Sequence, residues 1–292
     1  MAGVESSDRL TSLLQRFRVN TSLFHAGPLC GVTTFAARPG RGFLHILRRG
    51  EVAVTHREPG GAVKRIELDR PTLIFYPRPL EHAFHNAPAD GSDFACASLD
   101  VEGGATHPLL LTLPPVLIVP LDAVKGLEPL LQFLFDEVDN VRCGQRLIAD
   151  RLFEVVLIHL LRWILDHVGE LGIPSGILTG LADPRLAPAL VALHDAPEAD
   201  WTLDSMAREA RMSRSAFAAH FREVIGSSPG QYLTHWRLTI AQERLRAGAA
   251  VSTVAAELGY ANASSFSRVF SQHLGTAPRN WLAAPPQSPI PA

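Results

Sequence analysis

Four histidines in the first third of the chain stand out as residues that could do metal chemistry. They are His25, His45, His82 and His85. Imidazole is a common ligand of divalent transition metals, so a barrel that gathered these side chains could hold such an ion as a cofactor. His82 and His85 lie three residues apart on an expected strand or turn, so they can face different ways. Packed or solvated histidines are the alternative interpretation.

Two cysteines of the same region, Cys30 and Cys96, could do redox chemistry. A disulfide between them would need Cα atoms within about 7 Å and one thiol of lowered pKa. The alternative is that both are small buried apolar residues. The third cysteine, Cys143, begins an expected helix and has no obvious partner. An odd number of cysteines at low density is typical of a reducing compartment.

Arginine dominates the charge at the other end of the chain. Residues 201–292 contain nine arginines and five carboxylates, a net charge of +4, so the first 200 residues carry −6 of the total of −2. Guanidinium groups form paired hydrogen bonds with phosphate and with guanine. We therefore expect the basic end to meet a polyanion, with chance surface variation as the alternative.

The elements that would carry the histidines and cysteines are strands. Between residues 20 and 120, short apolar runs at 43–47, 52–55, 65–68 and 72–76 are separated by Gly, Pro and charged turns. This spacing predicts a compact β-barrel or sandwich of about eight short strands.

Helical periodicity replaces this pattern over residues 122–140 and 144–170. The second segment has a wide apolar stripe, which could cover the barrel, pair with a second subunit, or do both. Its residues are Leu147, Leu152, Val155, Val156, His159, Leu160, Trp163 and Ile164. Residues 169–180 are rich in Gly, Pro, Ser and Thr, and we expect a linker there.

Two segments of the basic region predict the same helix-turn-helix plan. In the first, Thr202 or Asp204 caps a short helix, and Ser213 caps a second helix that buries Phe217 and Phe221. The apolar face of the short helix holds Leu203, Met206, Ala207 and Ala210, with Met212 in the turn. The outer face of the second helix would point into a major groove of DNA.

The same plan recurs farther along the chain. One short helix has an apolar face made of Val251, Val254, Ala255 and Leu258. Gly259 permits a left-handed turn, and Phe266 and Phe270 repeat the buried i,i+4 pair. Residues 229–248 between the two units predict a continuous helix of about 19 residues, roughly 28 Å long. Successive major grooves lie about 34 Å apart, so this helix could hold two recognition helices on one side of a duplex.

Residues 183–282 resemble the DNA-binding domain of the AraC family of bacterial regulators. The residues that carry the resemblance are Ser213, Phe217, Phe221, Ser228, Pro229, Tyr232, Arg237, Ala241, Leu245, Val254, Ala255, Gly259, Tyr260, Ser265, Phe266, Arg268, Phe270, Gly275 and Pro278. The resemblance covers about a third of the chain. It implies sequence-specific binding to double-stranded promoter DNA, without chemistry on the DNA.

The resemblance also implies which residues meet the DNA. The family's base-reading positions correspond to Ser215, Ala218, Ala219, Ala263, Ser264, Ser267 and Arg268, and Asn262 shares the outer face of the second recognition helix. Arg268 is the best single candidate, because a guanidinium can grip guanine O6 and N7 together; the alternative is a phosphate or intramolecular contact. We expect Arg214 and Arg222 to contact phosphates. Ala218 and Ala219 offer only methyl contacts, so the first unit should discriminate sequence weakly.

The β-rich half resembles the cupin-like sensor domain found in some AraC-type regulators. The matching stretches are Phe43-Leu44-His45-Ile46-Leu47-x-x-Gly50 and Leu73-x-x-x-Pro77-x-Pro79-x-x-His82-x-x-x-Asn86. The chain has Leu47 where a cupin has a second histidine, and Arg70-Pro71 where a cupin has Gly-Asp. The cysteine spacing resembles that of relatives proposed to sense oxidants. The resemblance implies a domain that binds a small-molecule effector or responds to an oxidant.

The expected fold is α+β, with a cupin-like sensor barrel over residues 1–121, a helical linker and dimerisation region over 122–180, two helix-turn-helix units over 183–283, and a disordered tail over 284–292. The N-terminus has no signal-peptide pattern and no stretch of eighteen apolar residues occurs, so we expect a cytoplasmic protein without a membrane partner. We expect a homodimeric transcriptional regulator that is not an enzyme, with RNA polymerase as a further partner.

Two alternatives remain open at the level of the sequence. One is a cupin-type metal enzyme, or an oxidant sensor, fused to a DNA-binding tail. The other is an architectural DNA binder without preference for particular sites. The effector, the target promoter and the choice between activation and repression are also open.

Overall fold

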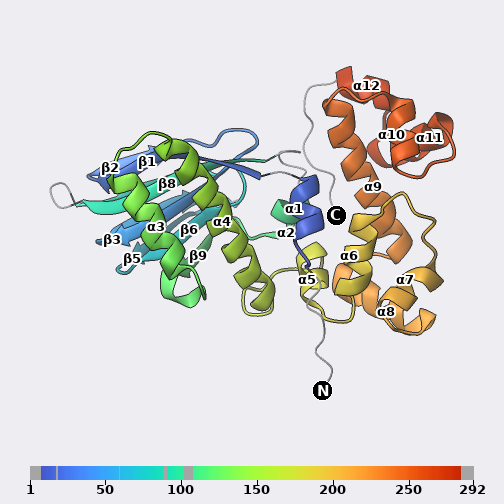
Figure 1. The fold of residues 1–292 in the computed structure, drawn as a ribbon, viewed down its shortest axis with the longest axis horizontal. Helices are drawn as coiled ribbons and strands as arrows, with labels where there is room; N and C mark the ends of the chain where they lie inside the picture. The colour runs from blue at the N-terminus through green and yellow to red at the C-terminus, as the bar shows by residue number, and fades with distance from the viewer. Residues whose placement is uncertain (1–7, 18, 59, 88–90, 102–107, 284–292) are drawn as a thin grey trace. The chain divides into compact units, whose positions relative to one another are not determined.

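The computed structural model describes residues 8–17, 19–58, 60–87, 91–101 and 108–283 (Figure 1). The described residues form two compact units. The sheet unit contains the described parts of 19–101 together with 113–167, and the helical unit contains 8–17, 108–112 and 168–283. The chain therefore passes between the units several times, and the fold of each is best followed separately.

Nine strands of the described residues build the sheet unit, close to the number that the sequence predicts. They are β1 (Val19–Leu29), β2 (Val32–Phe35), β3 (Arg41–Arg49), β4 (Val52–Arg57), β5 (Val63–Leu68), β6 (Thr72–Tyr76), β7 (His82–His85), β8 (Ser92–Val101) and β9 (Leu117–Pro120). One antiparallel sheet has the order β1-β8-β3-β6-β9, and the other has the order β2-β7-β4-β5. Each of the four predicted apolar runs lies within one strand, which confirms them as strands.

The core of the sheet unit is built by alternation along the strands. Side chains at every second position point to the same side of a sheet. The inward residues of both sheets meet in one cluster of Phe43, Leu47, Val52, Val54, Leu68, Ile74, Tyr76, Phe84, Phe94 and Cys96. The predicted α+β class, with a cupin-like sheet domain and a helical C-terminal region, is confirmed.

Helices α3 (Glu128–Asp139) and α4 (Gln145–Asp166) belong to the sheet unit, after a short 3-10 helix at Leu121–Ala123. The Thr21 hydroxyl of β1 donates to the Asp150 carbonyl of α4, and the Leu23 N–H donates to the Asp150 carboxylate over 2.6 Å. The predicted division at residues 121 and 122 is therefore wrong, because these contacts make α3 and α4 part of the sheet unit.

The predicted apolar stripe of α4 is only partly buried. Leu147 is 71% exposed and Val155 is 40% exposed, and both belong to the predicted stripe. The buried residues are Ala149, Phe153, Val156, Leu157, Leu160, Leu161, Ile164 and Leu165. The helix has apolar residues around more than half of its circumference, so periodicity alone could not choose the face that meets the sheet.

Ten helices of the described residues build the helical unit. They are α1 (Thr11–Arg16), α2 (Pro108–Thr112), α5 (Ile177–Ala182), α6 (Ala187–Asp195), α7 (Leu203–Glu209), α8 (Arg214–Ile225), α9 (Pro229–Arg246), α10 (Val251–Glu257), α11 (Ala263–Leu274) and α12 (Pro278–Ala283). Helix α5 corrects the predicted linker over 169–180, because Ile177 and Leu178 are buried in a helix. The predicted tail at 284–292 lies outside the described residues.

Helix α1 was not expected, since the sequence assigned the N-terminus to the barrel. Phe17, just after α1, is 1% exposed and packs edge-on against Trp236 of α9, with ring centroids 5.2 Å apart. The Arg9 guanidinium donates to the Leu181 carbonyl over 3.0 Å. These contacts place the N-terminal helix in the core of the helical unit.

A search of the helices in the described ranges finds none with the length and apolar character needed to cross a membrane.

Candidate nucleic-acid interface

Helices α7 and α8 form the first helix-turn-helix, and each begins with the cap that its sequence predicts. The Thr202 side chain accepts a hydrogen bond from the Ser205 N–H, and the Ser205 hydroxyl side chain accepts one from the Thr202 N–H, which completes a capping box. The Ser213 hydroxyl accepts from the Ala216 N–H at the start of α8. Asp204, the alternative cap, instead forms an exposed ion pair with Arg214.

The buried side of α8 fixes its orientation. Phe217 and Phe221 are fully buried, with ring centroids 5.4 Å apart, and Tyr232 of α9 meets Phe221 edge-on. Because these rings hold one face of α8 against α9, the opposite face must be exposed. On that face Arg214, Ser215, Ala219 and Arg222 are exposed, and Ala218 is half-buried.

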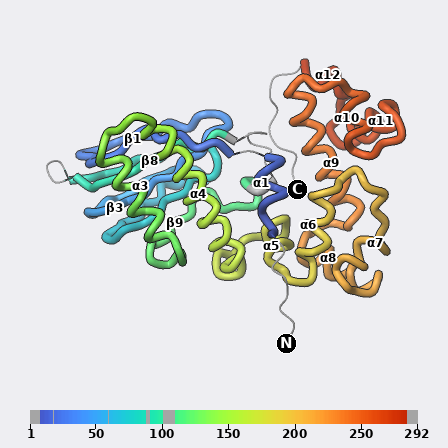
Figure 2. The backbone as a smooth tube through the Cα atoms, in the orientation of Figure 1, coloured from blue at the N-terminus to red at the C-terminus, as the bar shows by residue number. Residues whose placement is uncertain are grey.

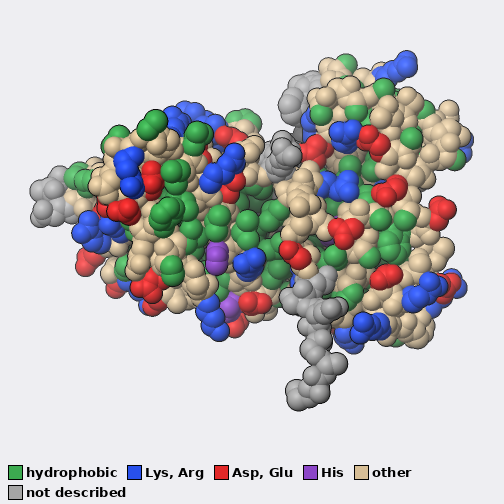
Figure 3. All heavy atoms as spheres, in the orientation of Figure 1, with side chains coloured by type: hydrophobic (Ala, Val, Ile, Leu, Met, Phe, Trp, Pro, Cys, Tyr) green, Lys and Arg blue, Asp and Glu red, His purple; other side chains and the backbone are tan. Residues whose placement is uncertain are grey.

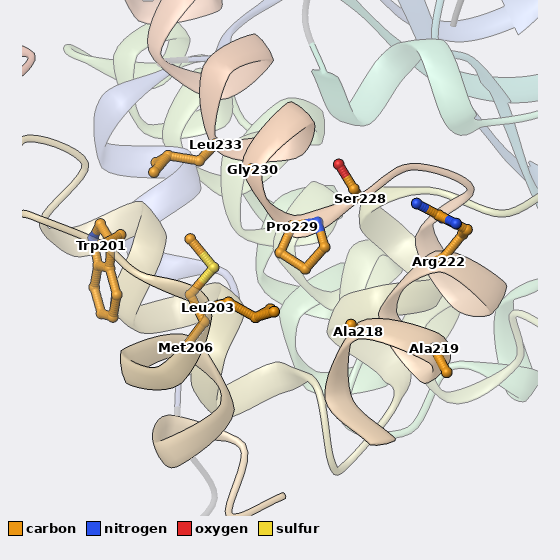
Figure 4. Close-up of a pocket in the computed structure, with 10 residues that line it drawn as sticks. All are labelled: Trp201, Leu203, Met206, Ala218, Ala219, Arg222, Ser228, Pro229, Gly230 and Leu233. Carbon is orange, nitrogen blue, oxygen red and sulfur yellow. The ribbon is translucent and has the colours of Figure 1, made fainter. Parts of the chain in front are cut away.

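A groove of about 440 Å³ runs beside this exposed face (Figure 4). It is lined by Trp201, Leu203, Met206, Ala218, Ala219, Arg222, Ser228, Pro229, Gly230 and Leu233. Figure 4 shows Ala218, Ala219 and Arg222 on one side and Ser228, Pro229 and Gly230, at the start of α9, next to them. The small side chains leave the backbone of α8 open to a close approach, and Arg222 supplies the charge at the edge.

Helices α10 and α11 repeat the arrangement of α7 and α8. Phe266 and Phe270 are fully buried, and their ring centroids are 5.5 Å apart. Gly259 in the turn has a φ of +74°, the left-handed conformation that the sequence predicts. A Cβ atom there would also collide with the Glu198 carbonyl oxygen, so both the backbone conformation and the close contact require glycine.

The outer face of α11 is exposed at the predicted positions. Asn262, Ser264 and Arg268 are exposed, and Ala263 and Ser267 are half-buried. The Asn262 side-chain oxygen accepts from the Ser265 N–H over 2.8 Å, so it caps α11 and only its amide nitrogen remains for another partner. The Asn-x-x-Ser spacing could have signalled this role.

The arginines of the two faces differ in their partners. Within the described parts of the chain, the guanidinium groups of Arg222 and Arg268 have no hydrogen-bond or ion-pair partner. Arg214 pairs with Asp204 at 3.5 Å, but both side chains are more than 60% exposed. Exposed pairs of this kind contribute little to stability, so all three arginines can meet phosphate at low cost.

Helix α9 joins the two helix-turn-helix units (Figure 2). It begins with a capping box between Ser228 and Gln231. Its 18 residues span about 27 Å at 1.5 Å per residue. Buried residues recur all along it, from Leu233 to Leu245. The predicted connecting helix is confirmed, and it is packed along its length.

Arg237, in the middle of α9, ties the two helix-turn-helix units together. Its guanidinium donates to the Pro197 carbonyl over 2.6 Å and to the Ala199 carbonyl over 3.0 Å, and it lies 5.6 Å from the Tyr260 ring centroid. Partial burial lowers the pKa of Arg237. Sequence reasoning missed this role because its partners are backbone carbonyls about forty residues away in the chain.

The four histidines of the sheet unit do not come together. The ring nitrogens of His45 and His82 lie 2.9 Å apart in the core. His85 is on the other face of β7, where it contacts the Thr55 hydroxyl, and His25 contacts the Gly27 carbonyl. Across the described ranges, no three His, Cys, Asp or Glu side chains are grouped so that they could hold a metal. The four histidines therefore do not form one cluster among the described residues, because strand alternation turns His85 away from His82.

Cys30 and Cys96 also lie apart. The register of β1 with β8 places Cys96 opposite His25, five residues before Cys30. At about 3.4 Å per residue this is roughly 17 Å along the strand, far beyond the reach of a disulfide. Cys30 is exposed and Cys96 is fully buried, and burial raises the pKa of the Cys96 thiol. A disulfide between these cysteines, one of the two interpretations that the sequence left open, is therefore not compatible with this fold.

Comparisons with known proteins agree with both halves of this architecture. A cupin family model matches residues 8–166, and a helix-turn-helix domain model matches residues 206–284. A putative AraC-like transcription regulator of Streptomyces lividans is 36% identical over 180 residues, which cover 61% of this chain and 59% of that protein. A protein of the same description from Streptomyces antibioticus is 36% identical over 187 residues, covering 62% and 61%.

A more extensive alignment is found with an uncharacterized HTH-type transcriptional regulator of Haemophilus influenzae. It is 29% identical over 265 residues, covering 83% of this chain and 86% of that protein. The alignments with the two Streptomyces proteins span only about three fifths of their lengths. The cupin model alone covers more than half of this chain. The chain thus belongs to the AraC-type family, as a member in which an N-terminal cupin domain is joined to a C-terminal AraC-type helix-turn-helix domain.

Proposed function

We propose that this chain is a sequence-specific transcriptional regulator, in which the helical unit binds double-stranded DNA and the sheet unit senses a small-molecule signal. The observation that carries the proposal is the repeated recognition surface. Helices α8 and α11 each bury a phenylalanine pair, expose the opposite face, and present there an arginine without a side-chain partner among the described residues. The description of the relatives as transcription regulators supports this function and a non-catalytic role.

The dimensions of α9 support binding to two successive grooves. Its length of about 27 Å, with a recognition helix beyond each end, is comparable with the groove spacing of about 34 Å. The interlocking of Arg237 with the residues before α7 and with Tyr260 supports a fixed spacing between the units. A fixed spacing favours a bipartite DNA site over independent binding by each unit.

The second part of the proposal is that the signal is a small molecule. The oxidant alternative needed Cys30 and Cys96 to pair, and the strand register separates them. The sheet unit has instead a compact aromatic interior with a pocket at its surface.

The third part is that the regulator is a homodimer formed through α3 and α4. Hydrophobic side chains gather over these helices in Figure 3, and exposed apolar residues there are Phe133, Val141, Leu147, Ile148 and Val155. Apolar clusters of this kind on a surface usually mark an interaction site. The predicted dimerisation region and the contact with RNA polymerase stay proposals. We also propose a cytoplasmic location, because a bacterial regulator binds DNA in the cytoplasm.

Selection from a random pool of duplex DNA by the full chain tests the main proposal. We expect a bipartite motif that binds at least about a thousandfold more tightly than random DNA at the same salt concentration. Equal affinity for all sequences would instead support an architectural binder. Stoichiometric metal in the purified protein, together with turnover of a small acid, would support the alternative of a cupin enzyme with a DNA-binding tail.

A further inference from the structure

A pocket of about 290 Å³ opens on the sheet unit, and the proposed function does not say what fills it. Its lining residues are Phe24, Thr34, Phe35, Ala36, Arg38, Arg41, Phe43 and Ser98. Three aromatic rings, two guanidinium groups and two hydroxyls thus meet around one space. Apolar walls with a few polar groups are typical of small-molecule sites, and this volume is at the small end of their range.

A break in the β1 ladder places the first of these rings at the pocket. The register of β1 with β8 shifts between Leu23 and His25, so Phe24 is the extra residue of a β-bulge. Bulges re-aim side chains and are common beside binding sites. The Phe24 ring is 45% exposed and lies 6.0 Å from the rings of Phe35 and Phe43. The bulge thus leaves an aromatic surface uncovered beside two other rings.

The charge of the pocket is positive. Arg41 forms a two-point ion pair with Asp100, over 3.0 and 3.1 Å. The Arg38 guanidinium is exposed and has no side-chain partner within the described residues. Two guanidinium groups with one carboxylate leave one positive charge unmatched, and a planar guanidinium binds a carboxylate through paired hydrogen bonds. These charges favour a ligand with a single negative charge.

A buried acceptor lies against the same aromatic walls. The His45 ring is fully buried, with its centroid 4.7 Å from that of Phe35 and 5.7 Å from that of Phe43. Burial lowers the pKa of His45 and lowers that of His82 to about 4, so both rings are neutral at pH 7. The Leu80 carbonyl accepts from His82 Nδ1–H over 2.8 Å, so His82 Nε2 accepts from His45 Nε2–H over 2.9 Å.

This assignment of protons leaves His45 Nδ1 as a lone-pair acceptor. Within the described residues the atom is buried and has no hydrogen-bond partner. An unpartnered buried polar atom destabilises the folded chain, and a donor on a ligand would recover that loss. The pocket itself combines an aromatic surface with an unmatched positive charge. The unfilled acceptor is not among its lining residues, but lies behind two of its rings, those of Phe35 and Phe43.

We infer that this pocket binds a one-ring aromatic carboxylic acid that carries a hydroxyl group. The ring packs against Phe24, Phe35 and Phe43, the carboxylate pairs with Arg38, and the hydroxyl donates to His45 Nδ1. The inference rests on the proposed function, in which the sheet unit is the sensor of the regulator.

Isothermal titration of the full chain with 2-, 3- and 4-hydroxybenzoate, their methyl esters and benzoate tests the inference. At pH 7.5, at least one hydroxy acid should bind tenfold or more tightly than its own methyl ester, and more tightly than benzoate. Arg38→Met should remove the preference for the acid over the ester. Arg65→Met, which removes an exposed arginine of β5 outside the pocket, is the matched control and should leave this preference unchanged.

His45→Phe should abolish the preference for the hydroxy acid over benzoate while keeping an aromatic ring in the core. If this variant does not fold, as judged by circular dichroism, the Arg38 comparison still decides the matter. Equal binding of acid and ester, or no binding of any hydroxy acid by the folded chain at millimolar concentration, overturns the inference. A chain that selects a DNA motif but binds no acid would refute the inference alone, whereas failure to select DNA would refute the proposed function.

Discussion

Arg222 and Arg268 have the same side chain and a similar exposed setting, yet they occupy different positions on their recognition helices. Arg222 is in the last turn of α8, at the edge of the groove, whereas Arg268 lies in the middle of α11. In a helix-turn-helix the N-terminal part of the recognition helix contacts base edges, and Arg222 lies farther from that part than Arg268 does, in reach of phosphates. Their effects on binding should therefore differ in kind.

We expect Arg268→Ala to lower the preference for one base pair of the site by about 1–3 kcal/mol, because a paired contact with guanine is lost. Arg222→Ala should weaken binding to all sequences evenly and reduce the salt dependence by about one counterion. Titrations of the selected site, its single-base variants and random DNA at several salt concentrations separate the two effects. Identical behaviour of the two variants would refute the assigned roles.

His194 of α6 predicts an acid sensitivity of the helical unit. The residue is 1% exposed, and its Nε2 is hydrogen-bonded to the Tyr232 hydroxyl over 2.7 Å. Burial, together with the nearby Arg16, lowers the pKa of His194 to about 3, so the ring is neutral in the folded state at pH 7. The unfolded chain takes up the proton first as the pH falls below 6.5, so stability is lost from about pH 6.5 towards 3.

The expected loss from this residue is up to about 1.4 kcal/mol per pH unit. His194→Gln keeps a hydrogen-bonding group for Tyr232 and cannot titrate, so the unfolding free energy of this variant should change less steeply with pH. Urea unfolding between pH 7 and 4 measures both slopes. Parallel slopes for the two proteins would show that another group controls the acid response.

At the scale of elements, the two helix-turn-helix units depend on turns with positive φ angles. Gly259 and Gly275 have φ values of +74° and +73°, but only at Gly259 would a Cβ meet other atoms, those of Glu198. We expect Gly259→Ala to destabilise the helical unit by about 3 kcal/mol, from conformational strain and the collision together. Gly275→Ala, with strain alone, should cost about 1 kcal/mol.

Thermal unfolding of these two variants measures the difference. Equal destabilisation would mean that the Gly259 turn can move away from Glu198. The two helix-turn-helix units would then be less tightly joined than the contact between Gly259 and Glu198 indicates.

Arg237 allows a direct test of the joint between the units. Arg237→Met removes the hydrogen bonds to Pro197 and Ala199 and keeps much of the packing against Tyr260. We expect affinity for the complete bipartite site to fall about tenfold, because a fixed spacing is lost, while affinity for a half-site hardly changes. Arg244→Met is the control, since its ion pair with Glu257 is exposed. An equal loss of affinity for the complete site and for the half-site would show that the substitution disturbs one helix-turn-helix unit and not the spacing between the two.

At the scale of the whole molecule, the N-terminal helix α1 is important because it belongs to the helical unit although the strands of the sheet unit follow it in the sequence. Helix α1 precedes the strands in the sequence but packs in the helical unit, where Phe17 meets Trp236 and the Arg16 guanidinium donates to the His194 carbonyl. Because α1 ends at Arg16 and β1 begins at Val19, only two residues separate α1 from the strand that carries Phe24 of the pocket. The chain thus offers a short covalent route between the two units.

Removal of residues 1–17 should expose Trp236 and destabilise the helical unit by about 3 kcal/mol, as expected for loss of a buried aromatic ring and its neighbours. The sheet unit should keep its stability. Hydrogen exchange resolved by peptide measures both units in the same sample, and removal of residues 1–7 is the control. Unchanged exchange in α6 and α9 would contradict the packing of α1.

Much of this protein follows from local patterns that its sequence makes visible. Phe217 with Phe221, and Phe266 with Phe270, predict the buried faces of α8 and α11 because an i,i+4 pair lies on one side of any helix. Ser213 and Gly259 predict where helices begin and turn, since capping and positive φ are properties of single residues. The strands that contain the four apolar runs follow from the same kind of local rule.

Contacts between distant segments required the tertiary structure. The face of α4 that meets β1, the distance from Cys30 to Cys96, and the turning of His85 away from His82 depend on strand register and packing. The joint at Arg237 and the docking of α1 depend on backbone carbonyls and rings supplied from far along the chain. A sequence fixes what each residue can do locally, but only the packed chain determines which distant groups come within reach, because those encounters follow from the sum of many weak contacts.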